Sequence, residues 1–74
     1  MNNAEDKKTM KLFGQHLRRL RDAKGMSMEE FANTCDMEKS QVYRIENGKT
    51  NPSLTTLNEL AAGLGIKLSE LVEY

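Results

Sequence analysis

The sequence has few residues that could form a disulfide framework or a metal site. Its 74 residues include one cysteine, Cys35, and one histidine, His16. A single cysteine excludes an intrachain disulfide and fits a reducing compartment, and one histidine without a cysteine cluster supplies no set of metal ligands. We therefore expect no metal and no cofactor. We interpret Cys35 as a small buried hydrophobic residue and His16 as an ordinary residue of a helix surface.

The chain also lacks any long apolar run. Its first ten residues, MNNAEDKKTM, contain no apolar core, and no later segment approaches the roughly 20 apolar residues that span a bilayer. We therefore expect a cytoplasmic protein. A chain this short forms one small domain that buries only about 60% of its unfolded surface, which makes a large enzyme cleft improbable. The sequence does not space a nucleophile, a base and an orienting group so that they would form a catalytic site. We therefore predict no catalytic residues and no enzyme.

Net charge is absent as well, because 11 basic and 11 acidic residues cancel. A formal charge of zero argues weakly against nucleic-acid binding, since DNA-binding domains often carry a basic excess. The charges are nevertheless segregated, with basic residues gathered in the first third of the chain. These residues are Lys7, Lys8, Lys11, Arg18, Arg19, Arg21 and Lys24. They form either a surface for an anionic partner or a solvated helix face.

The apolar residues of the chain repeat at helical spacing, which predicts an all-α protein. A stripe of apolar residues predicts a first helix over about residues 9–24, which Gly25 ends as a C-cap. Residues 1–8 are polar, and we expect them to form a disordered N-terminal arm. Residues 9–74 then make up the folded domain.

Capping residues divide the rest of the chain. Ser27 with Glu30 three residues later predicts a capping box that begins a short second helix. A third helix is expected over about residues 38–47. Ser53 is the predicted N-cap of a fourth helix that Gly65 closes, and a last helical turn follows.

The link between the second and third helices is so short that the helices must cross steeply. This arrangement is a helix-turn-helix over about residues 28–47. At 100° per residue, Val42, Ile45 and Glu46 face inward, which leaves a polar outward face on the third helix. Such a face suits the major groove of DNA, whose base edges present donors and acceptors. The alternative is a polar face that contacts only water.

Two segments, LRRLRDAKGMSMEEFA and KSQVYRIENGKTNPSLTTLNELAAGLGI, carry a family resemblance. Over about residues 13–71 the chain resembles the lambda-repressor-like helix-turn-helix family of XRE type. The resemblance implies a compact five-helix domain with the helix-turn-helix formed by its second and third helices. It also implies binding to double-stranded operator DNA, usually as a homodimer, with the third helix in the major groove.

The resemblance also assigns roles to residues. The positions that read bases are Lys39, Ser40, Gln41, Tyr43 and Arg44. The positions that contact phosphates are Ser27, Met28, Glu29, Asn47, Gly48, Lys49, Thr50 and Asn51. Arg44 is the expected guanine reader, because its planar guanidinium group can donate hydrogen bonds to O6 and N7 of guanine at the same time. Its alternative role is to bind a phosphate. An ion pair between Arg21 and Glu46 is expected to set the angle of the third helix.

Two positions depart from the family pattern. Met28 stands where relatives usually place glutamine, so backbone groups must carry more of the phosphate contact. Glu38 stands where relatives usually place serine or threonine, and its charge would lie near phosphates. Both departures predict modest affinity or a need for dimerisation. The candidate dimer contacts are Leu68, Leu71, Val72 and Tyr74, unless this last turn simply folds back on the first helix.

We therefore predict a small transcriptional regulator of repressor or controller type that binds specific double-stranded DNA. We expect no membrane contact and no small-molecule ligand. One alternative is a DNA-binding antitoxin that also holds a toxin. The other is a helical protein-interaction module that does not bind DNA.

Overall fold

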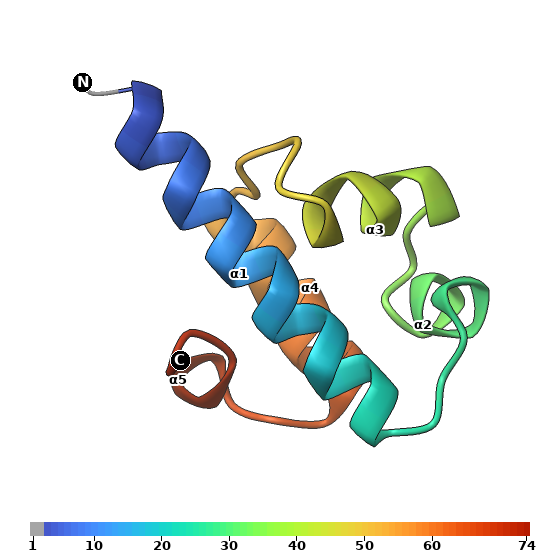
Figure 1. Ribbon diagram of the computed structural model, residues 1–74. Helices are drawn as coiled ribbons and strands as arrows, with labels where there is room; N and C mark the ends of the chain where they lie inside the picture. Colours follow the sequence, from blue (N-terminus) through green and yellow to red (C-terminus); the bar gives the residue numbers. More distant parts are fainter. Residues whose placement is uncertain (1–2) are drawn as a thin grey trace.

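The computed structural model describes residues 3–74, which form α-helices joined by short loops (Figure 1). The helices are α1 (Asn3–Ala23), α2 (Met28–Thr34), α3 (Lys39–Glu46), α4 (Leu54–Leu64) and α5 (Leu68–Leu71). The described part of the chain contains no strand, so the predicted all-α fold with five helices is confirmed. Helices α2 and α3 lie on one side of the long helix α1, α4 crosses behind it, and α5 lies on the other side (Figure 1).

Helix α1 begins earlier than the apolar spacing predicts. The expectation of a disordered arm over residues 1–8 is corrected, because the helix continues back to Asn3; the first two residues lie outside the described range. The first turn carries Glu5 and Asp6, whose carboxylates interact favourably with the positive end of the helix dipole. Polar residues therefore continue this helix beyond its apolar stripe.

The predicted caps are present at the ends of α2 and α4. Ser27 Oγ accepts a hydrogen bond from Glu30 N–H at 3.1 Å, and Ser27 N–H donates to Glu30 Oε1 at 3.0 Å. The bond from the Ser27 backbone, above all, holds the pKa of Glu30 below its usual value, because it favours the ionised carboxylate. Ser53 Oγ accepts from Thr56 N–H at 3.1 Å. At the end of α4, Gly65 adopts the left-handed conformation with a φ of 71°.

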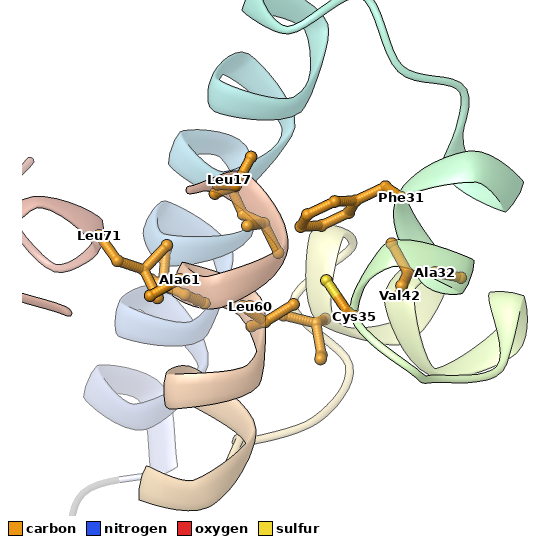
Figure 2. Packing of buried hydrophobic residues seen from close by; sticks show 11 residues of the cluster. Leu17, Phe31, Ala32, Cys35, Val42, Leu60, Ala61 and Leu71 are labelled. Atoms are coloured by element: carbon orange, nitrogen blue, oxygen red, sulfur yellow. The ribbon is translucent and has the colours of Figure 1, made fainter. Parts of the chain in front are cut away.

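Side chains from all of these helices meet in one hydrophobic core (Figure 2). Its fully buried members include Leu17 of α1, Phe31 of α2, Val42 of α3, Leu60 of α4 and Leu71 of α5. Cys35, at the end of α2, is buried as predicted, and desolvation raises the pKa of its thiol to about 11. Its sulfur lies against Gly63, where any Cβ would overlap it. The core thereby fixes α2 directly onto α4.

The link between α2 and α3 is a tight turn, in agreement with the prediction. Asp36 has a φ of 57°, in the left-handed region that aspartate tolerates better than most residues. Met37 N–H donates to Ala32 O at 2.8 Å, and Glu38 then occupies the N-cap position of α3. Helix α2, this turn and α3 form the helix-turn-helix.

The last helix packs back onto the core. Leu71 is fully buried within the chain, and Leu68 is half-buried against the same core. The prediction that Leu71 contacts a second subunit is therefore wrong, because helical spacing alone does not tell which surface covers an apolar stripe. Val72 and Tyr74 remain about half exposed, at 47% and 55%.

Candidate nucleic-acid interface

The outer side of α3 carries the residues predicted to read bases. Val42, Ile45 and Glu46 are buried, as the helical spacing predicts, and they hold α3 against the core. The residues on the exposed side are Lys39, Ser40, Gln41, Tyr43 and Arg44. The structure therefore presents every predicted base-reading side chain to solvent on one short helix, and the base contacts themselves stay a prediction.

Gln41 also supports the first turn of α3. Its Oε1 accepts a hydrogen bond from Glu38 N–H at 3.0 Å. This bond satisfies one of the free N–H groups at the start of the helix, as a capping box does. The amide nitrogen of Gln41 stays available as a donor to a base edge. Gln41 can therefore hold the helix start and contact DNA at the same time.

A polar hollow of about 250 Å³ lies between α3 and the start of α4. Its lining includes Gln41, Arg44, Thr50, Asn51, Ser53 and Thr56. Arg44 from the predicted base-reading set thus borders the same space as Thr50 and Asn51 from the phosphate set. Ser53 was predicted only as the N-cap of α4, and Thr56 was not predicted to have any role.

The loop after α3 presents exposed polar groups beside this hollow. Asn47 Nδ2 donates to Tyr43 O at 2.8 Å, so one amide hydrogen of this side chain bonds a carbonyl group at the C-terminal end of α3. Gly48 turns the chain with a φ of 67°. Lys49 is exposed and forms no ion pair with any residue from 3 to 74. Its ammonium group is therefore available to a phosphate.

The start of α2 offers backbone donors more than side chains. Ser27 uses both its hydroxyl and its N–H in the capping box, which leaves the N–H groups of Met28 and Glu29 in the first turn. The Met28 side chain packs against the core, whereas Glu29 is exposed. Helix N-termini bind phosphate through such N–H groups, and the Glu29 carboxylate opposes that contact.

The ion pair predicted between Arg21 and Glu46 is present. Arg21 Nε donates to Glu46 Oε2 at 2.7 Å, and Nη2 donates to Oε1 at 2.9 Å. Arg21 Nη1 donates to Met26 O at 2.9 Å and lies 3.4 Å from Asp22. The hydrogen bonds to Glu46 raise the pKa of Arg21 although burial opposes this. Both residues are more than nine-tenths buried, so neither side chain faces DNA.

Gly14 allows α3 to approach the backbone of α1. A Cβ at this position would lie 2.5 Å from both Ile45 O and Glu46 O. Any larger residue would therefore push the end of α3 away from α1. The role of Gly14 was not predicted, because a glycine within a helical pattern gives no apolar signal and its partners lie far along the chain. Gly14 and the Arg21–Glu46 pair together set the position of α3.

An apolar groove of about 190 Å³ lies beside the C-terminal residues, with Met10, Phe13, Val72 and Tyr74 in its lining. The Tyr74 ring stacks on His16 with ring centroids 5.0 Å apart and lies 6.1 Å from the Phe13 ring. His16 is therefore partly covered by the chain end, and its Nε2 has no hydrogen-bond partner among the described residues. The expectation of an ordinary surface histidine is corrected to this extent.

The described residues contain no cluster of His, Cys, Asp and Glu arranged to hold a metal ion. Among residues 3–74, no helix combines the length and the apolar character needed to cross a membrane. The features that the structure brings together are a polar helix face, a polar loop and backbone donors, which are the groups that proteins use to contact DNA.

A helix-turn-helix with an exposed, hydrogen-bonding second helix defines the class of helix-turn-helix DNA-binding proteins. A sequence model of the family HTH_3, described as helix-turn-helix, matches residues 17–71. The match covers most of the chain, so the chain belongs to this family. It is a DNA-binding transcriptional regulator.

Two curated control proteins resemble the chain over most of their own length. Control protein C.MunI of Mycoplasma sp. is 48% identical over 60 residues, which cover 80% of this chain and 81% of the relative. Control protein C.BamHI of Bacillus amyloliquefaciens is 34% identical over 64 residues, which cover 85% and 79% of the two chains. The crystal structure of the restriction-modification controller protein C.AhdI from Aeromonas hydrophila is 40% identical and has a TM-score of 0.85, over 88% of this chain and 94% of that chain.

Proposed function

We propose that the chain is a controller-type transcriptional regulator that reads a specific operator with α3 in the major groove. The observation that carries the proposal is the exposed polar side of α3, mounted on the core by Val42, Ile45 and Glu46. The similarity to control proteins over about four-fifths of each chain supports the controller type. Such a regulator acts where the DNA is, which we propose to be the cytoplasm.

Within this proposal Arg44 reads a base and Lys49 holds a phosphate. Arg44 lies on the outer side of α3, where its fork can approach a guanine edge. Lys49 lies in the loop beyond the helix. Contacts to DNA phosphates position the protein on the duplex without reading its sequence. Arg44→Ala should then relax the preference at one base position by about 1–3 kcal/mol, whereas Lys49→Ala should weaken binding to all sequences alike.

Selection of bound sequences from random duplex DNA tests these roles. The wild-type protein should enrich one operator, and Arg44→Ala should lose information at a single position of it. Lys49→Ala should enrich the same operator at lower affinity. Equal effects of both changes on specific and random DNA would refute the assignment. Absence of any enriched sequence with the wild-type protein would refute sequence-specific binding itself.

We further propose that the regulator acts as a homodimer. The surface that supports this is the apolar groove with the half-exposed side chains of Val72 and Tyr74 at its edge. A two-fold dimer would present its recognition helices to half-sites about 34–36 Å apart on one face of the DNA. Val72→Asp should shift the sedimentation equilibrium towards monomer. A wild-type protein that stays monomeric at high micromolar concentration, with and without DNA, would contradict the dimer.

A further inference from the structure

The N-terminal half of α1 extends past the end of α3. The loop that follows α3 crosses α1 at Lys11, because a Cβ on Gly48 would lie 2.8 Å from Lys11 Cα. Helix α1 continues beyond this crossing to Asn3. Figure 1 shows the first turns of α1 projecting past the loop, on the side where α3 ends.

The face of α1 that α3 covers carries basic residues beyond the crossing. Gly14 marks this face, because it contacts the carbonyl groups of Ile45 and Glu46. At 100° per residue, Lys7 lies only about 20° from Gly14 around the helix axis, and Lys11 lies about 60° from it. Both lysines are exposed.

The acidic residues of the first turn point elsewhere. On the same helical projection, Glu5 lies about 180° from Gly14 and Asp6 about 80° from it on the side away from Lys11. Among the described residues, neither Lys7 nor Lys11 forms an ion pair. The two ammonium groups are therefore not neutralised by the acidic first turn.

This basic strip begins at the loop that carries Lys49, because Gly48 of that loop lies against Lys11. The last turn of α3 meets α1 at Gly14, and α1 extends past this contact (Figure 1). Beyond this contact, Lys7 and Lys11 are exposed on the face of α1 that Gly14 marks. A duplex lying across α3 and Lys49 would next meet Lys11 and then Lys7, which are about 6 Å apart along the helix.

We propose that Lys7 and Lys11 extend the DNA-binding surface along α1 and bind phosphates of the duplex beyond the bases that α3 reads. The proposal rests on the DNA-binding function proposed above. These contacts add affinity and orient the protein on the duplex, but they do not read sequence, because lysine binds phosphate as a point charge. The competing interpretation, a lysine-rich helix face that contacts only water, makes the opposite prediction in the experiment below.

Binding to the selected operator is measured by fluorescence anisotropy from about 50 to 200 mM salt for the wild type, Lys7→Gln and Lys11→Gln. Glutamine matches lysine in helix propensity, so α1 should be preserved. Lys8→Gln is the matched control, since this residue lies on the same turn about 100° around the axis from Lys7. Lys67→Gln is the remote control, because it precedes α5 on the far side of α1 (Figure 1).

Each lost phosphate contact should reduce the slope of log K against log salt by about 0.9, so the ratio of wild-type to variant affinity should shrink about 3.5-fold over this fourfold salt range. Lys8→Gln and Lys67→Gln should keep the wild-type slope, and all variants should keep the selected sequence.

Two negative outcomes are distinct. If the wild type binds with a salt-dependent slope and Lys7→Gln behaves like Lys67→Gln, the extended surface is wrong and the proposed function stands. The same conclusion follows if Lys8→Gln reduces the salt slope as much as Lys7→Gln does, since the effect would then come from the total charge of the protein and not from a contact at Lys7. If the wild type shows no salt-dependent binding to duplex DNA, the proposed function fails and this inference with it.

Discussion

Replacing Glu46 with alanine should remove most of the protein's stability, because the change leaves the Arg21 guanidinium buried without its partner. The native pair has two hydrogen bonds, at 2.7 and 2.9 Å, and the two side chains are only 9% and 2% exposed. Water therefore cannot replace the lost carboxylate without opening the contact between α1 and α3. Arg21→Ala should destabilise the protein to a similar extent, since it leaves the buried Glu46 carboxylate without its partner and removes the donor to the carbonyl group of Met26.

The size of the effect follows from the burial of both charges. Removing one partner of a buried ion pair costs about 3–5 kcal/mol. A small domain has a free energy of unfolding near the low end of the usual range, about 5 kcal/mol. For a domain of this size each kcal/mol shifts the melting temperature by about 4–8 °C, so a fall of about 12–40 °C is expected. DNA binding would then weaken because a smaller fraction of the protein is folded.

Circular dichroism at one fixed protein concentration, with thermal and urea unfolding, measures this effect; a fixed concentration is needed because a dimer would shift the apparent stability. Arg19→Ala is the matched control, since this arginine is exposed on the same helix and should change stability by less than about 0.5 kcal/mol. The double variant Arg21→Met with Glu46→Leu should recover most of the stability, because apolar replacement of both partners is often neutral. If Arg21→Ala melts within about a degree or two of the wild type and only weakens DNA binding, the structural role is refuted.

Gly14→Ala should destabilise the protein by about 1–3 kcal/mol through overpacking against α3, although alanine is the better helix former by about 1 kcal/mol; a urea curve showing stabilisation would contradict the close contact. The wild type should be more stable against unfolding than Glu30→Gln above about pH 4.3, the usual pKa of glutamate. This advantage should vanish as the pH falls through the lowered pKa of Glu30, because the native state favours the carboxylate. Thermal melts at neutral and strongly acidic pH check this, and an undiminished advantage in acid would disprove it. Cys35, with a pKa of about 11 and a buried sulfur, should react with a thiol reagent at mildly alkaline pH only after urea unfolds the chain; stoichiometric labelling of the native protein would exclude that environment.

Local rules predicted the helix ends well, because each cap is a short-range interaction. Ser27 and Glu30 are three residues apart, so their hydrogen bonds depend on few other parts of the chain. Gly25 and Gly65, the predicted helix ends, adopt the left-handed conformation that is readily accessible to glycine. The inward face of α3 was likewise predictable, since helical spacing alone separates Val42 from its exposed neighbours.

The features that the sequence did not predict depend on distant contacts or on polar residues. The first turns of α1 have no apolar periodicity, so the predicted helix began only where its apolar stripe begins. Leu71 belongs to an apolar stripe that two different surfaces could cover, and only the fold shows that the core does so. Gly14 is important because Ile45 and Glu46 reach it from elsewhere in the chain. The Arg21–Glu46 contact was predicted only through the family resemblance.

The zero net charge does not exclude DNA binding, because the acidic residues differ in what they face. Glu46 is neutralised inside the protein by Arg21, and the Glu70 carboxylate accepts from the backbone at the start of α5. Glu29 and Glu38, in contrast, are exposed at the starts of α2 and α3, where they would repel phosphates. One subunit should therefore bind DNA modestly. Two subunits joined by the proposed dimer contact would bind more tightly, since the second subunit binds at a high effective concentration once the first is in place.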